Sequence, residues 1–593
     1  MEKATLGELP TWDLADLYPG IASPEIERDL DRAAAQAGEF RKRLAGRLAA
    51  LSGDQLGEAV AEYERIQEVL ERLGSYAHLV YAGDMSDPEL GRFYQTVSER
   101  VNGIGKDLVF FTLELNRIDD DALEARLADP TLARYRPWLR DIRVFRPYQL
   151  ADDLEQLLHE KAVSGRNAWI RLFDETMAAL RFPVDGRELT GEQALHLLSD
   201  RDGTKRRTAA RSLGKVFGEN ARLFALVTNT LVKDKEIEDT WRGLPQPASA
   251  RHLANHVEPE LVEALVAAVK EAFPRLSHRY YRLKAEWLGG PGAKHLDYWD
   301  RNAPLPEDDD RAVPWDEARE IVLDAYAAFS PAMAEIGRRF FDDPWIDAAV
   351  RPGKAGGAFA HPTVPSVHPY LLLNYQGKTR DVMTLAHELG HGIHQVLAAP
   401  RGTLMAETPL TLAETASVFG EQLTFRALLD AEPDPRRRRV MLAQKVEDML
   451  NTVVRQIAFY EFERRVHDER RRGELTPDRI GEIWLAVQAE SLGPALRFDD
   501  DYRHYWCYIP HFVHAPFYVY AYAFGDCLVN ALYGVYSDSP EGFEARYLDM
   551  LRAGGTLRHR ELLAPFGLDA SDSGFWSRGL RVIEDFVDEL AQG

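Results

Sequence analysis

The chain has 593 residues, too many for one hydrophobic core of ordinary size, so two or more cooperating subdomains are expected. Its 45% hydrophobic and 28% charged residues are typical of a soluble globular protein. The 72 basic and 95 acidic residues give a net charge of −23, which argues against a nucleic-acid partner and against general attraction to anionic membranes.

The sequence predicts neither a targeting segment nor a membrane span. Residues 1–5 lack the apolar core behind basic residues that a secretory signal needs, and no stretch of about 20 apolar residues could cross a bilayer. Cys507 and Cys527 are the only cysteines, which fits a reducing compartment and excludes a disulfide scaffold or a Cys-rich metal site. We therefore expect a cytoplasmic protein.

Most of the chain has the apolar spacing of amphipathic helices, so the predicted fold class is mainly α. Helical hairpins are expected over residues 24–116, and another helix begins near residue 151. Residues 180–189 place the turn dipeptide Asp185-Gly186 between two short β-compatible runs, which predicts a small hairpin.

We place a domain boundary beside this hairpin, with a helical N-terminal domain over residues 1–190 and a second domain over 191–593. Helices are expected again over 191–235 and 259–288.

Two charged runs are interpreted as ordinary surface. The acidic residues 307–310 lack calcium-loop spacing and predict a solvated loop. The arginines at 436–439 follow two prolines and predict the start of a helix with a charged face. Between these runs, the apolar stretch bounded by Pro369 and Gly377 is the best strand candidate in the chain.

The segment His387-Glu388-Leu389-Gly390-His391 matches the pattern H-E-x-x-H. Residues four apart on a helix lie on the same face, so both imidazoles can point at one zinc ion, and Glu388 can reach a water there as general base. At 100° per residue, the apolar side chains of this segment fall on the side away from the histidines. These apolar residues are Val382, Leu385, Ala386, Leu389, Ile393, Val396 and Leu397.

Catalytic zinc normally takes three protein ligands, so a third must be found. The extended pattern that supplies a distant histidine fails, because position 397 is Leu. His394 shares the face but would lie roughly 10 Å further along the helix axis, so we expect it to pack or to support the site. Glu414 on a second helix is our choice of ligand, with Glu407 and Glu421 in reserve; for Glu421 a supporting or solvent-exposed position is favoured over ligation.

Substrate contacts are expected just before the histidines. A strand edge containing Tyr370 and Leu372 could bind an extended peptide through backbone hydrogen bonds, or the strand could be buried and structural. Gly356 and Gly357 could let the backbone approach a ligand closely, or could form a plain turn. The expected fold is therefore helical, with a small β element beside the zinc helix.

Aromatic and histidine residues gather between positions 504 and 522. Pro516 suits the first turn of a helix on which Tyr518 and Tyr522 would share a face. Neutral tyrosine and histidine donors near a metal site are suited to stabilising an oxyanion, whereas an aromatic core is the alternative interpretation. We expect mixed use, with some tyrosines packing and one or two donating.

Several motifs, taken together and in order, resemble the M3 peptidase family, in particular its oligoendopeptidase F branch. The resemblance runs nearly from end to end, and the matching segments are residues 12–18, 352–359, 374–375, 387–394, 413–421, 509–512 and 516–522.

The resemblance implies a fold and a set of roles. The fold would be a two-lobed helical shell, zincin-like, around a deep substrate channel with zinc at its wall. Residues 1–190 would correspond to the oligopeptidase F N-terminal domain and residues 191–593 to the M3 catalytic domain. Access would be limited to short unstructured peptides.

The resemblance also assigns residues. His387, His391 and Glu414 would be the zinc ligands and Glu388 the base. His511 and one tyrosine among Tyr518, Tyr520 and Tyr522 would stabilise the transition state, and Tyr520 is also expected at the substrate. His514 lies outside the family pattern.

The predicted function is a zinc-dependent oligoendopeptidase with one Zn²⁺ per chain and short oligopeptides as its partners. Zinc would activate a water, Glu388 would take its proton, and the scissile carbonyl would be attacked. An exo-acting enzyme of the same fold, such as a dipeptidyl carboxypeptidase, is one alternative. A catalytically silent peptide-binding protein is another, which the intact Glu388 argues against.

Overall fold

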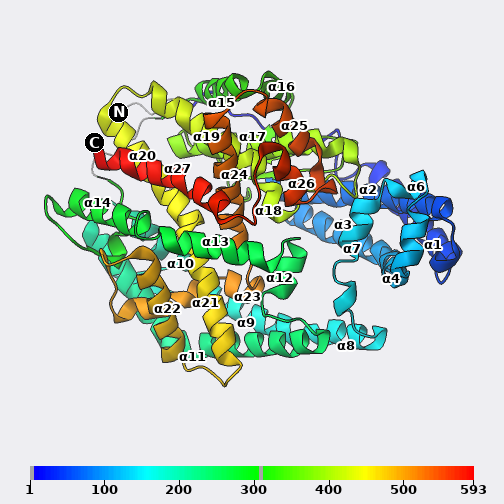
Figure 1. Cartoon of the computed structure of the whole chain (residues 1–593), viewed down its shortest axis with the longest axis horizontal. Helices are drawn as coiled ribbons and strands as arrows, with labels where there is room; N and C mark the ends of the chain where they lie inside the picture. The colour runs from blue at the N-terminus through cyan, green and yellow to red at the C-terminus, as the bar shows by residue number, and fades with distance from the viewer. Residues whose placement is uncertain (1–5, 306–311, 593) are drawn as a thin grey trace. The chain divides into compact units, whose positions relative to one another are not determined.

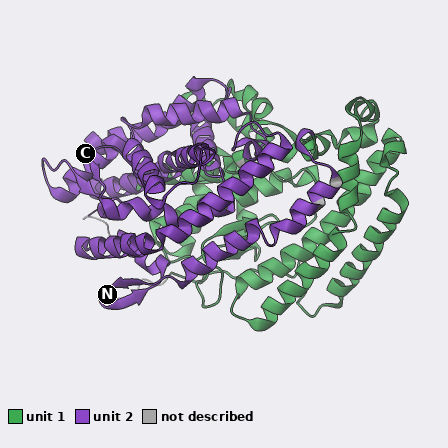
Figure 2. Cartoon of the chain, turned by 90° about the horizontal axis from the view of Figure 1, so that it is seen from below, with its two compact units in different colours: residues 1–146, 310–431, 535–568 green, residues 147–309, 432–534, 569–593 purple. Residues whose placement is uncertain are grey.

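The computed structural model describes residues 6–305 and 312–592, and it is predominantly helical (Figure 1). The predicted mainly α fold is therefore confirmed. The N-terminal residues 1–5 and the acidic run 307–310 lie outside the described residues. The chain folds into two compact units, shown in different colours in Figure 2. Unit 1 contains residues 1–146, 310–431 and 535–568, and unit 2 contains residues 147–309, 432–534 and 569–593.

Unit 1 begins with the predicted helical hairpins. Ser52 caps the longest of these helices, because its side chain accepts the N–H of Gln55 while the Gln55 side chain accepts the N–H of Ser52. The helices of this segment are α1 (Pro24–Leu44), α2 (Gly53–Gly83), α3 (Pro88–Gly105), α4 (Val109–Arg117), α5 (Asp120–Arg126), α6 (Pro130–Ala133) and α7 (Arg136–Ile142).

The remaining segments of unit 1 build the part of the molecule that carries the H-E-x-x-H motif. Their helices are α15 (Trp315–Phe329), α16 (Pro331–Asp342), α17 (Thr379–Ala398), α18 (Leu410–Ala413), α19 (Thr415–Ala431), α25 (Phe543–Arg552) and α26 (His559–Leu563). A three-stranded sheet accompanies them, in the order β4 (Ile346–Asp347), β6 (Tyr370–Leu372), β5 (Phe359–His361). Strand β6 runs parallel to β4 and antiparallel to β5.

Unit 2 is also helical. Its helices are α8 (Asp152–Ala162), α9 (Arg166–Ala179), α10 (Gly191–His196), α11 (Gly203–Arg242), α12 (Ser249–Ala254), α13 (Pro259–Ala272), α14 (Ser277–Gly289), α20 (Pro435–Thr452), α21 (Val454–Arg470), α22 (Pro477–Leu492), α23 (His511–His514), α27 (Ser573–Gln592) and most of α24 (Tyr520–Asp538). The arginine run opens α20, as predicted, and Asp434 caps that helix.

The predicted hairpin is present in unit 2. Strands β1 (Phe182–Val184) and β2 (Arg187–Leu189) pair antiparallel, and both turn residues between them have positive φ, 50° at Asp185 and 76° at Gly186. This two-residue turn matches the right-handed twist of paired strands. Residues 190 and 191 both lie in unit 2, and the domain boundary placed between them stays a prediction.

Within residues 6–305 and 312–592, no helix combines the length and the apolar character needed to cross a membrane.

Candidate metal centre

Helix α17 presents the H-E-x-x-H motif as its periodicity predicts. Five of the seven expected apolar residues are fully buried inside unit 1, and Val396 and Leu397 are half-buried. The helix start is fixed by Asp381, whose Oδ2 accepts the backbone N–H groups of Gln376 at 2.9 Å and Lys378 at 3.0 Å. The other face of the helix carries His387 and His391, whose side chains stay partly exposed.

Close packing between α17 and α19 brings the third candidate ligand to this face. Gly390 leaves no room for a side chain, since a Cβ there would stand 2.6 Å from the carbonyl oxygen of Ala416 and 2.8 Å from the hydroxyl of Tyr326. That hydroxyl donates to the carbonyl of Ala386 at 2.9 Å and so ties α15 to α17. Glu414 lies at the junction between α18 and α19.

His387, His391 and Glu414 form a group whose ligand atoms all lie within 4.8 Å of one another, so they could hold a metal ion. Glu414 Oε2 is 3.4 Å from His387 Nε2 and 3.5 Å from His391 Nε2. The hydroxyl of Ser417 donates to the same carboxylate at 2.7 Å and fixes its orientation.

The two reserve carboxylates occupy different positions. Glu421 Oε2 lies 3.3 Å from His387 Nδ1, the ring nitrogen that faces away from Glu414. A carboxylate at this position sets the tautomer and the orientation of a ligating histidine. Glu407 lies outside the group of three and lines an adjacent cavity.

The electrostatics of the group favour a cation. Burial alone lowers the pKa of His387, but the hydrogen bond with Glu421 and the nearby carboxylates of Glu414 and Glu388 outweigh burial and raise that pKa to about 9. Among the described residues none forms such a hydrogen bond with His391, and burial lowers its pKa to about 4. Three carboxylates therefore surround two imidazoles, and this donor set fits a divalent cation that accepts nitrogen and oxygen ligands.

Glu388 follows His387 on α17 but is not one of the three grouped ligands. Its side chain is only 7% exposed, and burial, reinforced by the Glu414 carboxylate, raises its pKa to about 7 although His387 opposes the shift. The backbone N–H of Ala360 in β5 donates to its carboxylate. A carboxyl group with a pKa near 7 is suited to taking and returning a proton.

The small sheet corrects the expectation for Tyr370 and Leu372. Strand β6 is the middle strand, paired on both sides, and the two side chains are fully buried. The hydroxyl of Tyr370 donates to the carbonyl of Asp13 at 2.9 Å. A strand paired along both edges has no free backbone groups for a peptide, so β6 is structural; the edge strand nearest Glu388 is β5.

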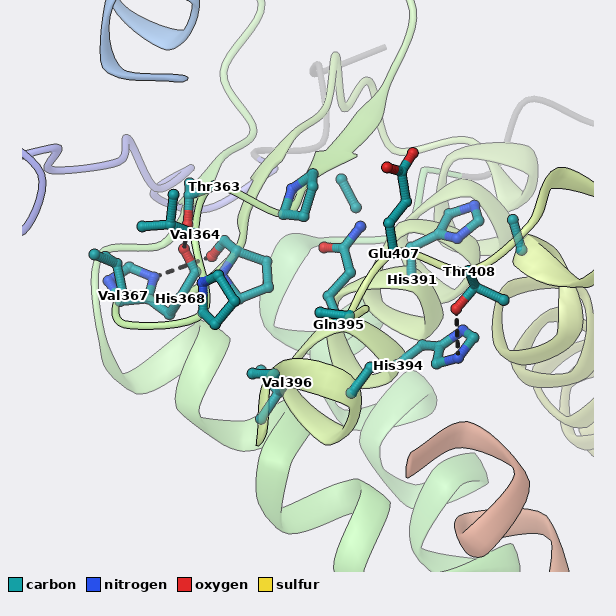
Figure 3. Close-up of a pocket in the computed structure, with 18 of the residues that line it drawn as sticks. Thr363, Val364, Val367, His368, His391, His394, Gln395, Val396, Glu407 and Thr408 are labelled. Carbon is teal, nitrogen blue, oxygen red and sulfur yellow. Dashed lines mark hydrogen bonds between the residues drawn. The ribbon is translucent and has the colours of Figure 1, made fainter. Parts of the chain in front are cut away.

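A cavity of about 630 Å³ in unit 1 adjoins the metal group. Glu388, His391, Gln395, Glu407 and Thr408 are among the residues that line it. Figure 3 labels the last four of these. His394 also lines this cavity, where its Nε2 lies 3.3 Å from the Thr408 hydroxyl. His394 therefore packs beside the site and is not one of the three clustered ligands, as expected.

The glycine pair lies on a loop held by a buried lysine. Lys354 Nζ is fully buried, donates to Asp347 Oδ1 at 2.7 Å and also donates to the carbonyl of Leu373 at 2.6 Å. Gly357 has φ of 76°, a turn conformation, and open space surrounds the Cβ position at both Gly356 and Gly357. This geometry suits a close approach of the backbone to a ligand, and it equally suits a plain turn.

His511, Tyr518 and Tyr522 gather in unit 2. His511 Nε2 lies 3.3 Å from the Tyr522 hydroxyl, and the rings of Tyr518 and Tyr522 are 5.3 Å apart. All three side chains are half-buried, and burial, together with the charge of Arg455, lowers the pKa of His511. The expected pairing of the two tyrosines is present, but Pro516 and Tyr518 precede α24, which begins only at Tyr520.

Tyr520 and His514 have structural positions. The Tyr520 ring is fully buried, and its hydroxyl accepts from Asn255 Nδ2 at 2.9 Å and lies 3.1 Å from His252 Nδ1, so the predicted substrate contact is wrong. His514 is exposed and pairs with Asp174 at 2.8 Å.

Two features of the site were not predicted from the sequence. Strand β5 is only three residues long and half-buried, so no period-two pattern marks it. Gly390 was part of the motif, but its packing role was not recognised; a glycine inside an amphipathic helix is the signal that could have indicated close helix packing.

Comparison with known proteins agrees with this geometry. Residues 196–582, well over half of the chain, match the model of peptidase family M3, and residues 114–182 match the model described as Oligopeptidase F.

The relatives extend over the whole chain. Oligopeptidase PepF of Bacillus subtilis is 26% identical over 98% of this chain and 87% of its own length. Group B oligopeptidase PepB of Streptococcus agalactiae is 25% identical over 98% of this chain and 96% of its own length. The crystal structure of oligoendopeptidase-F from Enterococcus faecium shares the fold, with a TM-score of 0.71, 23% identity and coverage of 96% of this chain and 98% of that one. With its histidine pair and nearby carboxylates set on α17 and α19, this chain belongs to peptidase family M3.

Proposed function

We propose that this chain is a zinc-dependent oligoendopeptidase that hydrolyses internal bonds of short unstructured peptides. The observation that carries the proposal is the meeting of His387, His391 and Glu414 within 4.8 Å, beside the buried carboxyl group of Glu388. The names of the relatives, oligopeptidase PepF and oligoendopeptidase F, support peptides of limited length as substrates.

Zinc is the metal proposed for this group, with one ion per chain. Two neutral imidazoles and one carboxylate form a ligand set of catalytic zinc sites, and they leave one position for water or substrate. Zinc held there would lower the pKa of a bound water and polarise the scissile carbonyl.

Glu388 is proposed as the general base and then the general acid. Its carboxylate would take a proton from the attacking water and pass it to the leaving amine. The N–H of Ala360 would keep that carboxylate oriented while Glu421 would hold the ring of His387.

His511, Tyr518 and Tyr522 are proposed to stabilise the oxyanion that forms at the scissile carbonyl. All three side chains are half-buried, and hydrogen-bond donors act most strongly where water is partly excluded. Burial and the charge of Arg455 lower the pKa of His511, which favours its neutral form. In place of β6, the edge of β5 is proposed to pair with the substrate backbone, and the Gly356-Gly357 loop to lie beside it.

We also retain the domain boundary at residues 190 and 191, with the N-terminal part oligopeptidase F-like and the rest catalytic; the separate family matches over 114–182 and 196–582 support it. A reducing cytoplasm is proposed as the compartment, since Cys507 and Cys527 are buried free thiols.

Mass spectrometry of a mixed peptide library, digested with and without a zinc chelator, tests the function. We expect internal cleavage of short peptides, inhibition by the chelator and recovery on adding zinc. Peptides acetylated at the N-terminus and amidated at the C-terminus should still be cut. Loss of cleavage on capping would favour an exopeptidase, and absence of any cleavage with zinc bound would favour a silent peptide-binding protein.

A further inference from the structure

Phe517, which directly precedes Tyr518, has a strained backbone. Its φ is +60°, in the left-handed region that side chains other than glycine and asparagine rarely adopt. Its ring is only 1% exposed, so the conformation is built into the interior of unit 2. Such strain persists only where the surrounding structure enforces it.

Glu463 on α21 contacts the backbone at this turn. The backbone N–H of Phe517 donates to Glu463 Oε1 at 2.8 Å. The Glu463 side chain is almost fully buried, and its other oxygen has no hydrogen-bond partner in the described part of the chain. A buried carboxyl group that makes a single hydrogen bond to one backbone amide is costly, which calls for a reason to place it there.

The same helix face receives the Phe517 ring. His467, one turn after Glu463, has its ring 4.6 Å from that of Phe517, and Tyr460, nearly one turn before, has its ring 5.9 Å away. Residues at these spacings share one side of a helix. Helix α21 thus holds Phe517 by its backbone and by its side chain together.

The two residues beside Phe517 are held from α12. Arg251 Nε donates to the carbonyl of Pro516 at 3.4 Å, and its guanidinium lies over the ring of Tyr518 at 5.4 Å. The turn at Phe517 therefore decides the direction in which the chain leaves Pro516, and with it the placement of Tyr518 before α24 begins.

We infer that Glu463 is a positioning residue, which fixes Tyr518 and Tyr522 for transition-state stabilisation by holding the left-handed turn at Phe517. The inference rests on the proposed function for its catalytic consequence. The physical part, that Glu463 orders residues 515–522, stands on the contacts within unit 2.

The test uses full-length, zinc-loaded enzyme carrying Glu463→Gln, Glu463→Asp or Glu463→Leu. Gln keeps an acceptor oxygen for the Phe517 amide, Asp withdraws it by one methylene, and Leu removes it. We expect kcat within about threefold of wild type for Gln, a clear decrease for Asp and a decrease of tenfold or more for Leu, with KM little changed. Asp keeps the test decisive if the Leu variant does not fold.

Amide hydrogen exchange over residues 515–522 is the second readout. Protection should be kept in Glu463→Gln and lost in Glu463→Asp and Glu463→Leu, while α17 stays protected. The matched control is Glu461→Leu on the same helix, which removes a pair with Lys270 at 2.6 Å. It should lower stability without changing kcat or the exchange of 515–522.

The outcomes separate the two proposals. Unchanged kcat and unchanged exchange in Glu463→Asp and Glu463→Leu would overturn the positioning role. Tyr518→Phe and Tyr522→Phe are measured in parallel: if both keep wild-type kcat while exchange rises in Glu463→Asp, the oxyanion role of the tyrosines fails but Glu463 still orders the segment.

Discussion

Gly390 of α17 lies directly against the carbonyl oxygen of Ala416 in α19. A Cβ atom at position 390 would be only 2.6 Å from that oxygen. This is too close for any side chain, so the glycine sets how closely the two helices approach. The histidines come from one helix, and Glu414 lies at the start of the other. The spacing of the metal group therefore depends on a residue that carries no functional group.

Replacing Gly390 by Ala should separate α17 from α19. We expect a loss of about 1–3 kcal/mol in the free energy of unfolding and a weaker metal affinity, because Glu414 moves away from both histidines. Calorimetric titration of the metal-free protein with zinc and chemical denaturation measure the two effects.

Gly392→Ala is the matched control. Its Cβ would meet the ring of Phe340 on α16 at 2.7 Å, so it should destabilise the protein without changing zinc affinity. Equal zinc affinity in Gly390→Ala and wild type would contradict the role given to the helix contact.

Glu421→Ala should weaken zinc binding by roughly 10–100-fold, since His387 loses the acceptor that orients its ring. Glu407→Ala, which removes a carboxylate from the adjoining cavity, should leave the affinity within a factor of about two. Competition with a fluorescent chelator measures both. The interpretation of Glu421 is wrong if the two variants bind zinc equally well.

The sequence predicted the histidine pair well, and the reason is physical. A spacing of four residues and an apolar stripe are both local properties of one helix, and they gave the correct face of α17. Glu414 was chosen because zinc chemistry requires a third ligand and because a second helix downstream of the motif offers a carboxylate. The mainly α class rested on the same periodicity.

The errors all concern contacts between segments distant in sequence. Tyr370 and Leu372 were predicted at a strand edge, but pairing of β6 with both β4 and β5 is decided by residues 346–347 and 359–361. Tyr520 was predicted at the substrate, but its buried hydroxyl accepts a hydrogen bond from Asn255 in another part of unit 2. The left-handed turn at Phe517 depends on Glu463, and no local pattern predicts it.

The stability of the protein should depend on pH through Glu463. Burial raises its pKa to about 8, although the Phe517 N–H, Arg251 and Lys235 all oppose the shift. A carboxyl group with a raised pKa binds its proton more tightly when folded, so its contribution is complete below about pH 4.5 and is lost as pH rises through about 8.

Glu463→Gln does not titrate and provides the comparison. Relative to wild type, its free energy of unfolding should rise between pH 5 and 9 by an amount on the order of a few kcal/mol. Urea denaturation across that range measures the difference. A difference that is independent of pH would show that Glu463 titrates normally.

The peptidase activity should decrease at acidic pH because Glu388 becomes protonated. The base must be ionised, so kcat/KM falls as the pH drops below its pKa. That pKa is about 7 without a cation, and a divalent cation nearby would lower it, so the midpoint should lie below pH 7 with zinc bound. Zinc content is measured at each pH, since protonation of His387 and His391 also releases metal. A flat profile from pH 4.5 to 7 with zinc retained would contradict the role of Glu388.

Zinc content and peptide hydrolysis of Glu388→Gln, measured on the same sample, give the sharpest test of Glu388 as the base of a zinc peptidase. We expect one zinc per chain, as in wild type, and a loss of several orders of magnitude in kcat, because the ligands remain while the base is gone. Wild-type turnover by Glu388→Gln with zinc bound would rule out this role for Glu388.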